Sequence, residues 1–138
     1  MACIVEHGQR YAVALFLVAK GTKMKNVVQA LLKQCRKIGL KTKLLLLDRG
    51  FYDVSTISYL KKVQQPFLMP LVIRGKPITK TKAATGTRKY AERKKQFWDW
   101  YRLTMRKNVD EEWIEKHTWF NVCVYCKNLN GQRNKHCR

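Results

Sequence analysis

The sequence predicts an α/β protein, in which short apolar strands alternate with amphipathic helices. Three observations carry this prediction: an apolar run over residues 9–20, a helical stripe over 24–38, and four leucines, Leu44 to Leu47, that stop at Asp48. Strand, helix and strand at this spacing are typical of parallel units with helices on the faces of a sheet. At 138 residues the chain is long enough for about one domain with a hydrophobic core.

The first strand is expected over residues 9–20, because apolar side chains occupy both of its faces and Gly21 follows it. Such a strand is typical of the interior of a sheet. The helix over 24–38 has apolar residues three and one positions apart, which places them on one stripe. Thr22 is a candidate cap for this helix and Gly39 a candidate stop.

The leucine run suits a strand buried on both faces, since four residues are too few for a buried helix. Asp48 then lies at the carboxyl end of a strand, the edge where α/β proteins collect their chemistry. Gly50 allows a tight turn, and Asp53 can cap a second helix over residues 54–64. The pattern alone leaves two interpretations of Asp48 open: a carboxylate satisfied by backbone donors, or a functional group.

A further strand, bounded by prolines, is predicted over residues 66–73. Beyond it the sequence predicts the order of elements less clearly. Residues 76–95, rich in Lys, Arg, Thr and Gly, predict a mobile basic arm or insertion. An aromatic cluster follows, made of Phe97, Trp98, Trp100 and Tyr101. Its spacing leaves helix and strand open, and it is interpreted as core in preference to a stacking surface for nucleobases. Residues 110–115 are predicted as a solvated helical start and 118–127 as a last strand, with a turn at 128–131.

The charge points to an anionic partner. The chain has 29 Lys and Arg against nine Asp and Glu, a net charge of +20. A chain this basic repels itself unless its charge is offset, and nucleic acid is the usual partner. Residues 71–107 hold twelve basic and two acidic residues, a net charge of +10, so the basic character belongs to particular surfaces. The basic residues of the 24–38 helix are interpreted as a solvated face.

Several other classes of protein are disfavoured. No apolar run approaches the length of a bilayer span, and no signal-peptide cleavage site follows the short apolar run at 11–20. Five cysteines are an odd number without a disulfide framework, which fits a reducing cytoplasm. Cys123 and Cys126 could join His136 and Cys137 at a zinc ion by count. On a strand, however, the first two point to opposite faces, so no zinc is expected.

Carboxylate–metal chemistry is the remaining catalytic candidate, because phosphate-loop, dinucleotide and nucleophile motifs are absent. Two divalent ions can activate a water or a sugar hydroxyl and stabilise the leaving oxygen of a phosphodiester, which requires about three converging carboxylates. Asp48 is placed to be one, whereas Asp53 is explained as a helix cap. The remaining candidates lack a comparable strand-end setting: Glu6, Asp110, Glu111, Glu112 and Glu115.

The segment Leu44 to Val54 (LLLLDRGFYDV) resembles the middle of DDE-type insertion-sequence transposases. The similarity continues through a helix ending in Tyr59-Leu60-Lys61-Lys62 and through Gln65-Pro66-Phe67-Leu68-Met69-Pro70. His7 to Ala14 and the Gly21 turn are similar to the preceding segment of that family. Thr118 to Arg138 is more weakly similar to its later strand and Gly/Lys-rich turn.

This resemblance implies an incomplete RNase H-like fold: a mixed sheet flanked by helices, with a basic insertion. It also implies DNA strand cleavage and transfer at insertion-sequence ends with Mg²⁺ or Mn²⁺. Asp48 matches the second of three carboxylates, so it is expected to be a catalytic residue and a metal ligand. Met1 to Glu6, where the first would lie, contains no Asp, and the Tyr-x-x-Arg-x-x-x-Glu pattern of the third is absent. The chain is therefore expected to be a central fragment from a truncated or interrupted element, inactive alone.

The expected organisation is a core portion over residues 1–75, a basic and aromatic insertion over 76–117, and a truncated strand and turn of the same domain over 118–138. DNA is the expected partner, and the expected location is the cytoplasm, in association with the nucleoid. Its backbone would contact Arg49, Arg74, Lys76, Lys80, Lys82, Arg88, Lys89, Arg93, Lys94 and Lys95. Loss of the first strand would expose a sheet edge, which favours a homo-oligomer.

A second class of function stays open. The chain fits a small basic module without catalytic ancestry that binds RNA or single strands, with Asp48 structural and with stacking by Trp98, Trp100 or Tyr101. An unstable remnant without function also remains open. Tryptophan quenching by single strands in preference to duplex would favour the module.

Overall fold

The computed structural model describes residues 1–91, 97–109 and 112–124, whereas 92–96, 110–111 and 125–138 lie outside the described structure. The fold is mixed α/β, as predicted, and its described strands form three two-stranded sheets. The chain divides into two compact units, residues 1–68 and 69–138. The boundary between the units falls within the predicted core portion of residues 1–75.

The first unit opens with an antiparallel hairpin of β1 (Ala2–Glu6) and β2 (Gln9–Ala14). His7 and Gly8 make its two-residue turn with φ of 46° and 80°, the conformation that matches the twist of a hairpin. The predicted strand over residues 9–20 is too long, because the apolar pattern continues past the last paired residue. Among the described strands β2 pairs with β1 alone, so its predicted place inside a sheet is wrong.

Helix α1 (Met24–Lys37) confirms the predicted helix over 24–38. Its buried stripe consists of Val27, Val28, Leu32 and Cys35. The predicted cap at Thr22 is wrong: the N-cap is Lys23, whose side chain makes no capping hydrogen bond. No helix in the described part of the chain is long and apolar enough to cross a membrane.

A parallel β–α–β unit follows: β3 (Leu45–Leu46), the short 3₁₀ turn η1 (Arg49–Phe51), α2 (Val54–Lys62) and β4 (Phe67–Leu68). The predicted parallel arrangement is confirmed for this pair. Both strands are shorter than predicted, because few backbone groups find partners across the pair. The amides of Leu45 and Leu47 donate to the carbonyls of Pro66 and Leu68, each at 2.9 Å.

Both helices end in the same motif, in which an amide just beyond the helix donates to a carbonyl more than one turn back. The left-handed residue after α1 is Gly39 (φ 78°), as predicted. After α2 it is Gln64 (φ 51°), and the amide of Gln65 donates to the carbonyl of Leu60 at 2.9 Å. A non-glycine residue therefore holds the strained position of α2.

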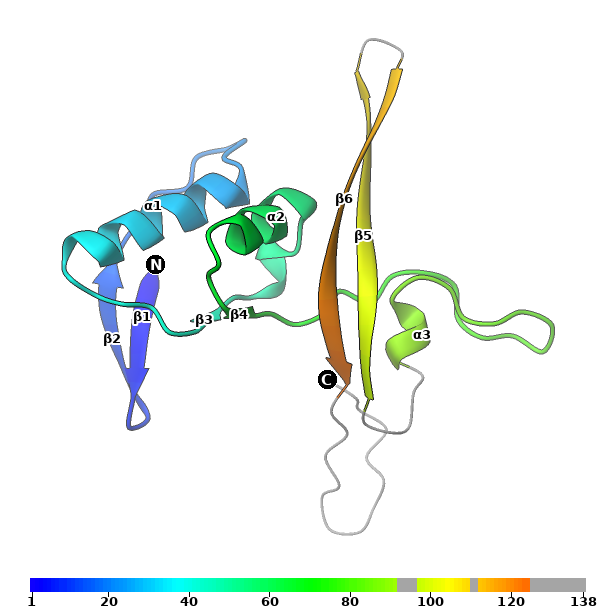
Figure 1. Cartoon of the computed structure of the whole chain (residues 1–138), viewed down its shortest axis with the longest axis horizontal. Coiled ribbons are helices and arrows are strands. Elements are labelled where there is room, and N and C mark those ends of the chain that lie inside the picture. The colour runs from blue at the N-terminus through cyan, green and yellow to red at the C-terminus, as the bar shows by residue number, and fades with distance from the viewer. Residues whose placement is uncertain (92–96, 110–111, 125–138) are drawn as a thin grey trace. The chain divides into compact units, whose positions relative to one another are not determined.

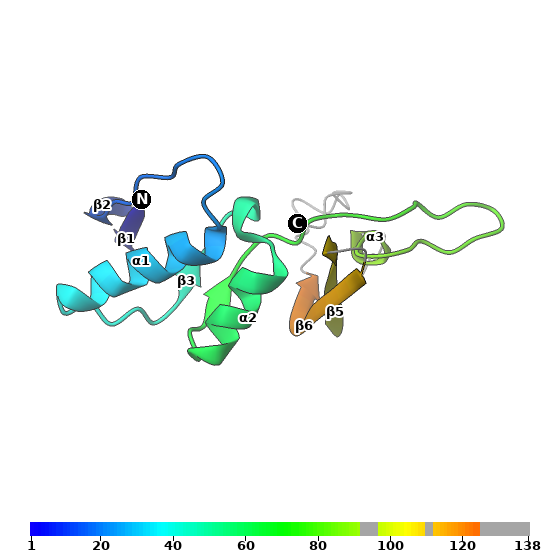
Figure 2. The same cartoon turned by 90° about the horizontal axis from the view of Figure 1, so that it is seen from above.

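Helices α1 and α2 pack on one face of the β3–β4 pair (Figures 1 and 2). The core of this unit joins Val28 and Leu32 of α1 to Leu60 of α2. Packed against that core are Leu45, Leu47, Phe51, Tyr59 and Phe67. On the other face Leu46 and Leu68 are 63% exposed. The leucine run thus packs against the core on one face and is exposed on the other. Its predicted burial on both faces is wrong for the described residues.

The second unit is built on a long antiparallel hairpin of β5 (Phe97–Val109) and β6 (Glu112–Val124), seen as the twisted ribbon in Figure 1. The aromatic cluster is therefore strand. The helical start predicted at 110–115 is wrong where the structure describes it, because Glu112 and Glu115 are in β6. The predicted strand over 118–127 begins earlier, at Glu112. Residues 125–127 and the predicted turn at 128–131 lie outside the described residues.

One face of this hairpin carries the core of the second unit. Tyr90, on the short helix α3 (Arg88–Ala91), is buried with Val122, and Leu71 packs against them. The ring of Tyr101 meets the rings of Tyr90 and Phe120 edge-on, with both pairs of centroids 5.8 Å apart. The interpretation of the aromatic cluster as core is thus confirmed for Tyr101 but wrong for Trp98 and Trp100, which are exposed on the other face of the hairpin.

Candidate functional site

Asp48 follows the leucine run at the carboxyl end of β3 and is the N-cap of η1. Its Oδ1 accepts a hydrogen bond from the amide of Gly50 at 2.8 Å. Within the described residues this is the single hydrogen bond of the Asp48 side chain, which is exposed. One carboxylate oxygen thus orders the turn, and the other is open to a ligand from solvent.

Gly50 lies close to the side chain of Asp48. It lacks a left-handed φ, but a Cβ at this position would lie 3.0 Å from Oδ1 of Asp48. A larger residue would require the exposed carboxylate to shift by a few tenths of an ångström. The exposed Arg49 lies between Asp48 and Gly50 in the sequence and brings a positive charge next to Asp48. The Asp-Arg-Gly sequence therefore makes a compact turn with a carboxylate and a guanidinium at its surface.

Asp53 serves as the predicted helix cap. Its two carboxylate oxygens accept from the amide (2.9 Å) and the hydroxyl (2.5 Å) of Thr56, a fully buried residue of α2. This pairing gives both carboxylate oxygens a structural role in the cap. The interpretation of Asp53 as a cap is confirmed.

Within the described residues, Asp48 belongs to no cluster of metal-binding side chains. Strand β1, which precedes the Tyr11 strand, contains no Asp and ends at Glu6. Asp99 accepts from the hydroxyl of Tyr90 at 2.9 Å in the second unit. No group of three or more His, Cys, Asp or Glu side chains that could hold a metal ion occurs in the described ranges. A Mg²⁺ ion fits Asp48 as one oxygen ligand, whereas two-metal chemistry requires further carboxylates.

The cysteines considered for zinc are only partly described. Cys123 is an exposed residue of β6. Cys126, His136 and Cys137 lie outside the described residues.

Most of the predicted DNA-contacting residues belong to one segment, the basic arm, defined as residues 72–89 of the second unit. It contains Arg74, Lys76, Lys80, Lys82, Arg88 and Lys89. Arg49 lies in the first unit beside Asp48, and the others lie outside the described residues: Arg93, Lys94 and Lys95. The structure thus places six of the ten candidates on one arm.

The basic arm folds back on itself, running out and returning to α3 (Figure 1). The amide of Thr85 donates to the carbonyl of Lys76 at 3.1 Å, and the amide of Arg88 to that of Arg74 at 3.0 Å. Threonine hydroxyls complete the pairing: Oγ1 of Thr85 accepts from the Lys76 amide (2.9 Å), and Oγ1 of Thr87 from the Arg74 amide (2.7 Å). A defined set of hydrogen bonds therefore orders a segment that the sequence predicted to be mobile.

Two glycines permit the close crossing of the arm's two sides. At Gly75 (φ 109°) a Cβ would lie 2.1 Å from the carbonyl oxygen of Thr85. At Gly86 (φ 60°) it would lie 2.7 Å from the carbonyl oxygen of Arg74. Both contacts are shorter than real Cβ atoms tolerate, so these positions admit glycine alone without a shift of the backbone.

The outer part of the arm carries uncompensated positive charge. Lys76, Lys80 and Lys82 are exposed, and no ion pair involves them within the described residues. Nearer α3 the charges are engaged: Nε of Arg88 donates to the carbonyl of Gly75 at 3.0 Å. Nζ of Lys89 lies 3.9 Å from Oδ2 of Asp99. The tip of the arm is therefore the part best suited to contact phosphates.

A second candidate surface lies on the face of the β5–β6 hairpin opposite its core, where the sequence offered nucleobase stacking by Trp98, Trp100 or Tyr101 only as an alternative. Strand alternation and the register place all four tryptophans of the chain on this face: Trp98, Trp100, Trp113 and Trp119. Their exposed fractions are 70%, 59%, 71% and 46%, respectively. Their even spacing within each strand was the available signal. It had no meaning until the two strands were known to pair.

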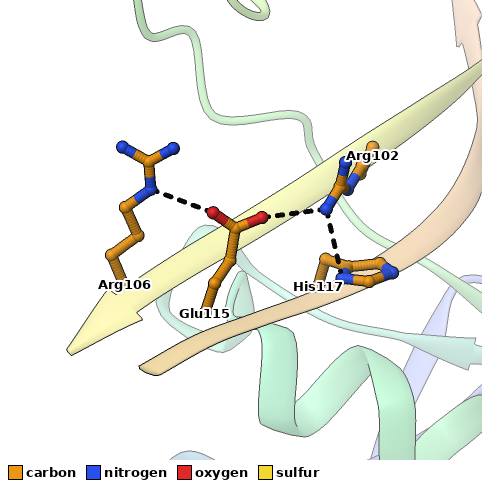
Figure 3. A network of polar contacts seen from close by, with 4 residues as sticks. All are labelled: Arg102, Arg106, Glu115 and His117. Atoms are coloured by element: carbon orange, nitrogen blue, oxygen red, sulfur yellow. Dashed lines mark hydrogen bonds and ion pairs between the residues drawn. The ribbon is translucent and has the colours of Figure 1, made fainter. Parts of the chain in front are cut away.

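The register places a polar network on the same face of the hairpin, and Figure 3 shows its four side chains. Glu115 of β6 accepts from Nη2 of Arg102 at 2.8 Å through one oxygen and from Nε of Arg106 at 3.0 Å through the other. Nη2 of Arg102 also lies 3.3 Å from Nδ1 of His117. One carboxylate thus holds two arginines of β5, and Arg106, Trp113 and Glu115 line an open hollow on this face.

The chain matches no protein-family model, no curated protein and no solved structure. Its functional interpretation therefore depends on the residues and on their geometry.

Proposed function

We propose that this chain is part of the catalytic domain of a DDE-type insertion-sequence transposase with an RNase H-like fold, and that it binds DNA. The observation that carries the proposal is Asp48, an exposed carboxylate at the carboxyl end of the first strand of a parallel β–α–β unit. That edge is where open α/β sheets bind ligands. The Asp-Arg-Gly-Phe turn at this edge is also the part of the sequence that most resembles the family.

Asp48 is proposed as a ligand of Mg²⁺ or Mn²⁺ through the oxygen that does not cap η1. The ion would supply Lewis-acid stabilisation of a scissile phosphodiester. Arg49 is placed to attract the neighbouring phosphates. Since Asp48 belongs to no cluster of metal-binding side chains in the described ranges, the chain by itself should bind DNA but not cleave it.

The basic arm is proposed to hold the DNA backbone. Lys76, Lys80 and Lys82 project from an ordered segment with Gly75 at its base and lack acidic partners within the described residues. Contacts of this kind position a duplex without reading its sequence. Binding is therefore expected to be nonspecific and to weaken steeply as salt rises.

A salt titration of binding to duplex DNA tests the DNA-binding part of the proposal. The double variant Lys80→Ala/Lys82→Ala should lower the slope of log K against log[salt] by about 1.8, because each lost phosphate contact removes about 0.9. Lys33→Ala/Lys37→Ala removes the same charge from α1 and should leave the slope nearly unchanged. Salt-insensitive binding, or equal effects of the two double variants, would contradict the role of the arm.

A cleavage assay with supercoiled DNA and Mg²⁺ tests the catalytic part. The chain alone should leave the DNA intact, and Mn²⁺ should broaden the NMR signals around Asp48 in the wild type but not in Asp48→Asn. Robust cleavage that disappears in Asp48→Ala would overturn the inactivity of the isolated chain. Broadening that persists in Asp48→Asn would overturn the metal-ligand role.

A further inference from the structure

We propose that the outer face of the β5–β6 hairpin is a binding site for single-stranded nucleic acid, with bases stacked on tryptophans and phosphates bound by Arg102 and Arg106. This site uses neither Asp48 nor any residue of the basic arm. It does not depend on a transposase ancestry. The proposal concerns a surface that duplex DNA, with its bases already stacked, would not occupy in the same way.

The first support is the number and placement of the tryptophans. An exposed indole is costly to keep in water, and four of them on one face of a two-stranded ribbon form an apolar patch of the kind that marks an interaction site. The opposite face of the same hairpin already holds the core, with Leu103, Thr118 and Val122 buried. Trp98, Trp100 and Trp113 lie outside this core.

The spacing along β5 suits successive bases. Trp98 and Trp100 are two residues apart on one face, which separates them by about 6.8 Å along the strand. Trp113 lies farther along the ribbon, opposite Asn108. Aromatic side chains set along a basic groove are the usual platform for an unpaired strand, because every base offers a flat face to stack on.

Charge decides between the partners that would suit such a face. Tryptophan and arginine are also common in protein interfaces, and a second copy of the chain could cover the patch. Two copies that each carry +20 repel one another, however, whereas a polyanion is attracted. The arginines between the tryptophans are the residues best suited to bidentate contact with phosphate.

Glu115 gives the site a distinctive property. Its two oxygens accept hydrogen bonds from Arg102 and Arg106 at 2.8 and 3.0 Å. The phosphate oxygens of a bound strand would take the same positions beside the two guanidinium groups. The carboxylate therefore pre-positions both guanidinium groups over the face and competes with the strand for them. Replacing Glu115 by an uncharged residue should free the arginines and strengthen binding.

Titration with a 12-mer of deoxythymidylate, followed by quenching of tryptophan fluorescence and by anisotropy of a labelled strand, tests the stacking. Trp98→Ala, Trp100→Ala and Trp113→Ala should each weaken binding roughly 5- to 100-fold. Lys107→Ala and Lys116→Ala remove charge from the core-side face of the same hairpin and should change it less than about threefold. Circular dichroism of each variant confirms that the hairpin is intact.

The matched pair Glu115→Gln and Glu112→Gln tests the competition. Both remove one negative charge from β6, but Glu112 lies on the other face. Glu115→Gln should tighten binding about 3- to 10-fold, and Glu112→Gln should leave it nearly unchanged. Equal effects of the two variants would show that Glu115 acts only through the net charge of the chain. They would contradict its competition with the strand for Arg102 and Arg106.

Two further results would overturn the site itself. One is wild-type affinity in all three tryptophan variants. The other is a concentration-dependent dimer in sedimentation that Trp100→Ala abolishes, which would assign the face to a second copy of the chain. Because the basic arm is intact in these variants, duplex binding and its salt slope should be unaffected, so failure here is distinguishable from failure of the proposed function.

Discussion

Two aspartates only five positions apart in the sequence have different jobs in the structure. Asp53 uses both oxygens to cap α2, whereas Asp48 uses one oxygen on a turn of three residues and keeps the other exposed. A carboxylate that accepts hydrogen bonds from its own helix through both oxygens contributes stability. A carboxylate with one oxygen open to solvent is available for a ligand. The distinction was predictable from sequence only in part, since both residues precede a turn or a helix.

Replacement of the two aspartates should separate these jobs. Asp53→Ala should lower the free energy of unfolding by about 1–3 kcal/mol, because it removes a cap and leaves the buried Thr56 hydroxyl without its acceptor. Asp48→Ala, at an exposed site, should cost less than about 0.5 kcal/mol. Urea denaturation followed by circular dichroism measures both. Equal losses would mean that Asp48 is mainly structural.

The ends of the two helices provide a second test at the level of single residues. Gln64 holds a left-handed φ of 51° after α2, the position that glycine holds after α1. Gln64→Gly should raise the free energy of unfolding by about 0.5–1 kcal/mol, and Gly39→Ala should lower it by a similar amount. The same denaturation experiment applies, and a loss of stability in Gln64→Gly would contradict the strain.

At the level of elements, the basic arm depends on a glycine rather than on its lysines. Gly75→Ala would place a Cβ against the Thr85 carbonyl, so the two sides of the arm should separate. Amide hydrogen exchange at Lys76 and Thr85 should then accelerate by an order of magnitude or more. Gly21→Ala is the control, since Gly21 also has a positive φ (84°) but nothing near its missing Cβ. Unchanged exchange in Gly75→Ala would show that the arm is not held by this crossing.

The elements differ in how far the sequence predicted them, and the difference follows the range of their interactions. The helices at 24–38 and 54–64 were predicted well, because their periodicity is a local property, although the predicted cap at Thr22 was wrong. The strand at 9–20, the leucine run and the strand at 66–73 were predicted as too long, and the first two as too buried, because strand length and burial depend on distant partners. The β5–β6 hairpin was left undecided, since lysines at 107 and 116 interrupt its core face and tryptophans fill its outer face.

The candidate site shows the same division. Asp48 was found because its turn lies in one short stretch of sequence. Stacking by Trp98 and Trp100 was an alternative from the sequence, but the face that joins them to Trp113 and Trp119 was not predicted, because it exists only once two strands of thirteen residues are paired in one register. Spacing within one strand indicates a face, but the strands must be paired before the faces can be combined.

At the level of the whole molecule, the net charge of +20 should dominate the response to salt. Screening shortens the range of repulsion from about 30 Å at 0.01 M to about 8 Å at 0.15 M. The melting temperature of the free chain should therefore rise over this range, and low concentrations of a polyanion should raise it further. Calorimetry or a thermal circular dichroism scan measures it, and a melting temperature that falls with salt would contradict the dominance of self-repulsion.

The register of β5 and β6 also has a consequence for the order in which the molecule folds. The two strands meet first at Val109 and Glu112, so the hairpin can zip from its closed end without bringing distant residues together. Such a step takes about 1–10 μs in isolated hairpins. The β3–β4 pair must instead bring Leu45 to Phe67 and gains very few backbone hydrogen bonds by doing so. The loss of chain entropy therefore precedes most of the stabilising contacts. We therefore expect the C-terminal ribbon to form early and the N-terminal β–α–β unit to set the overall folding rate.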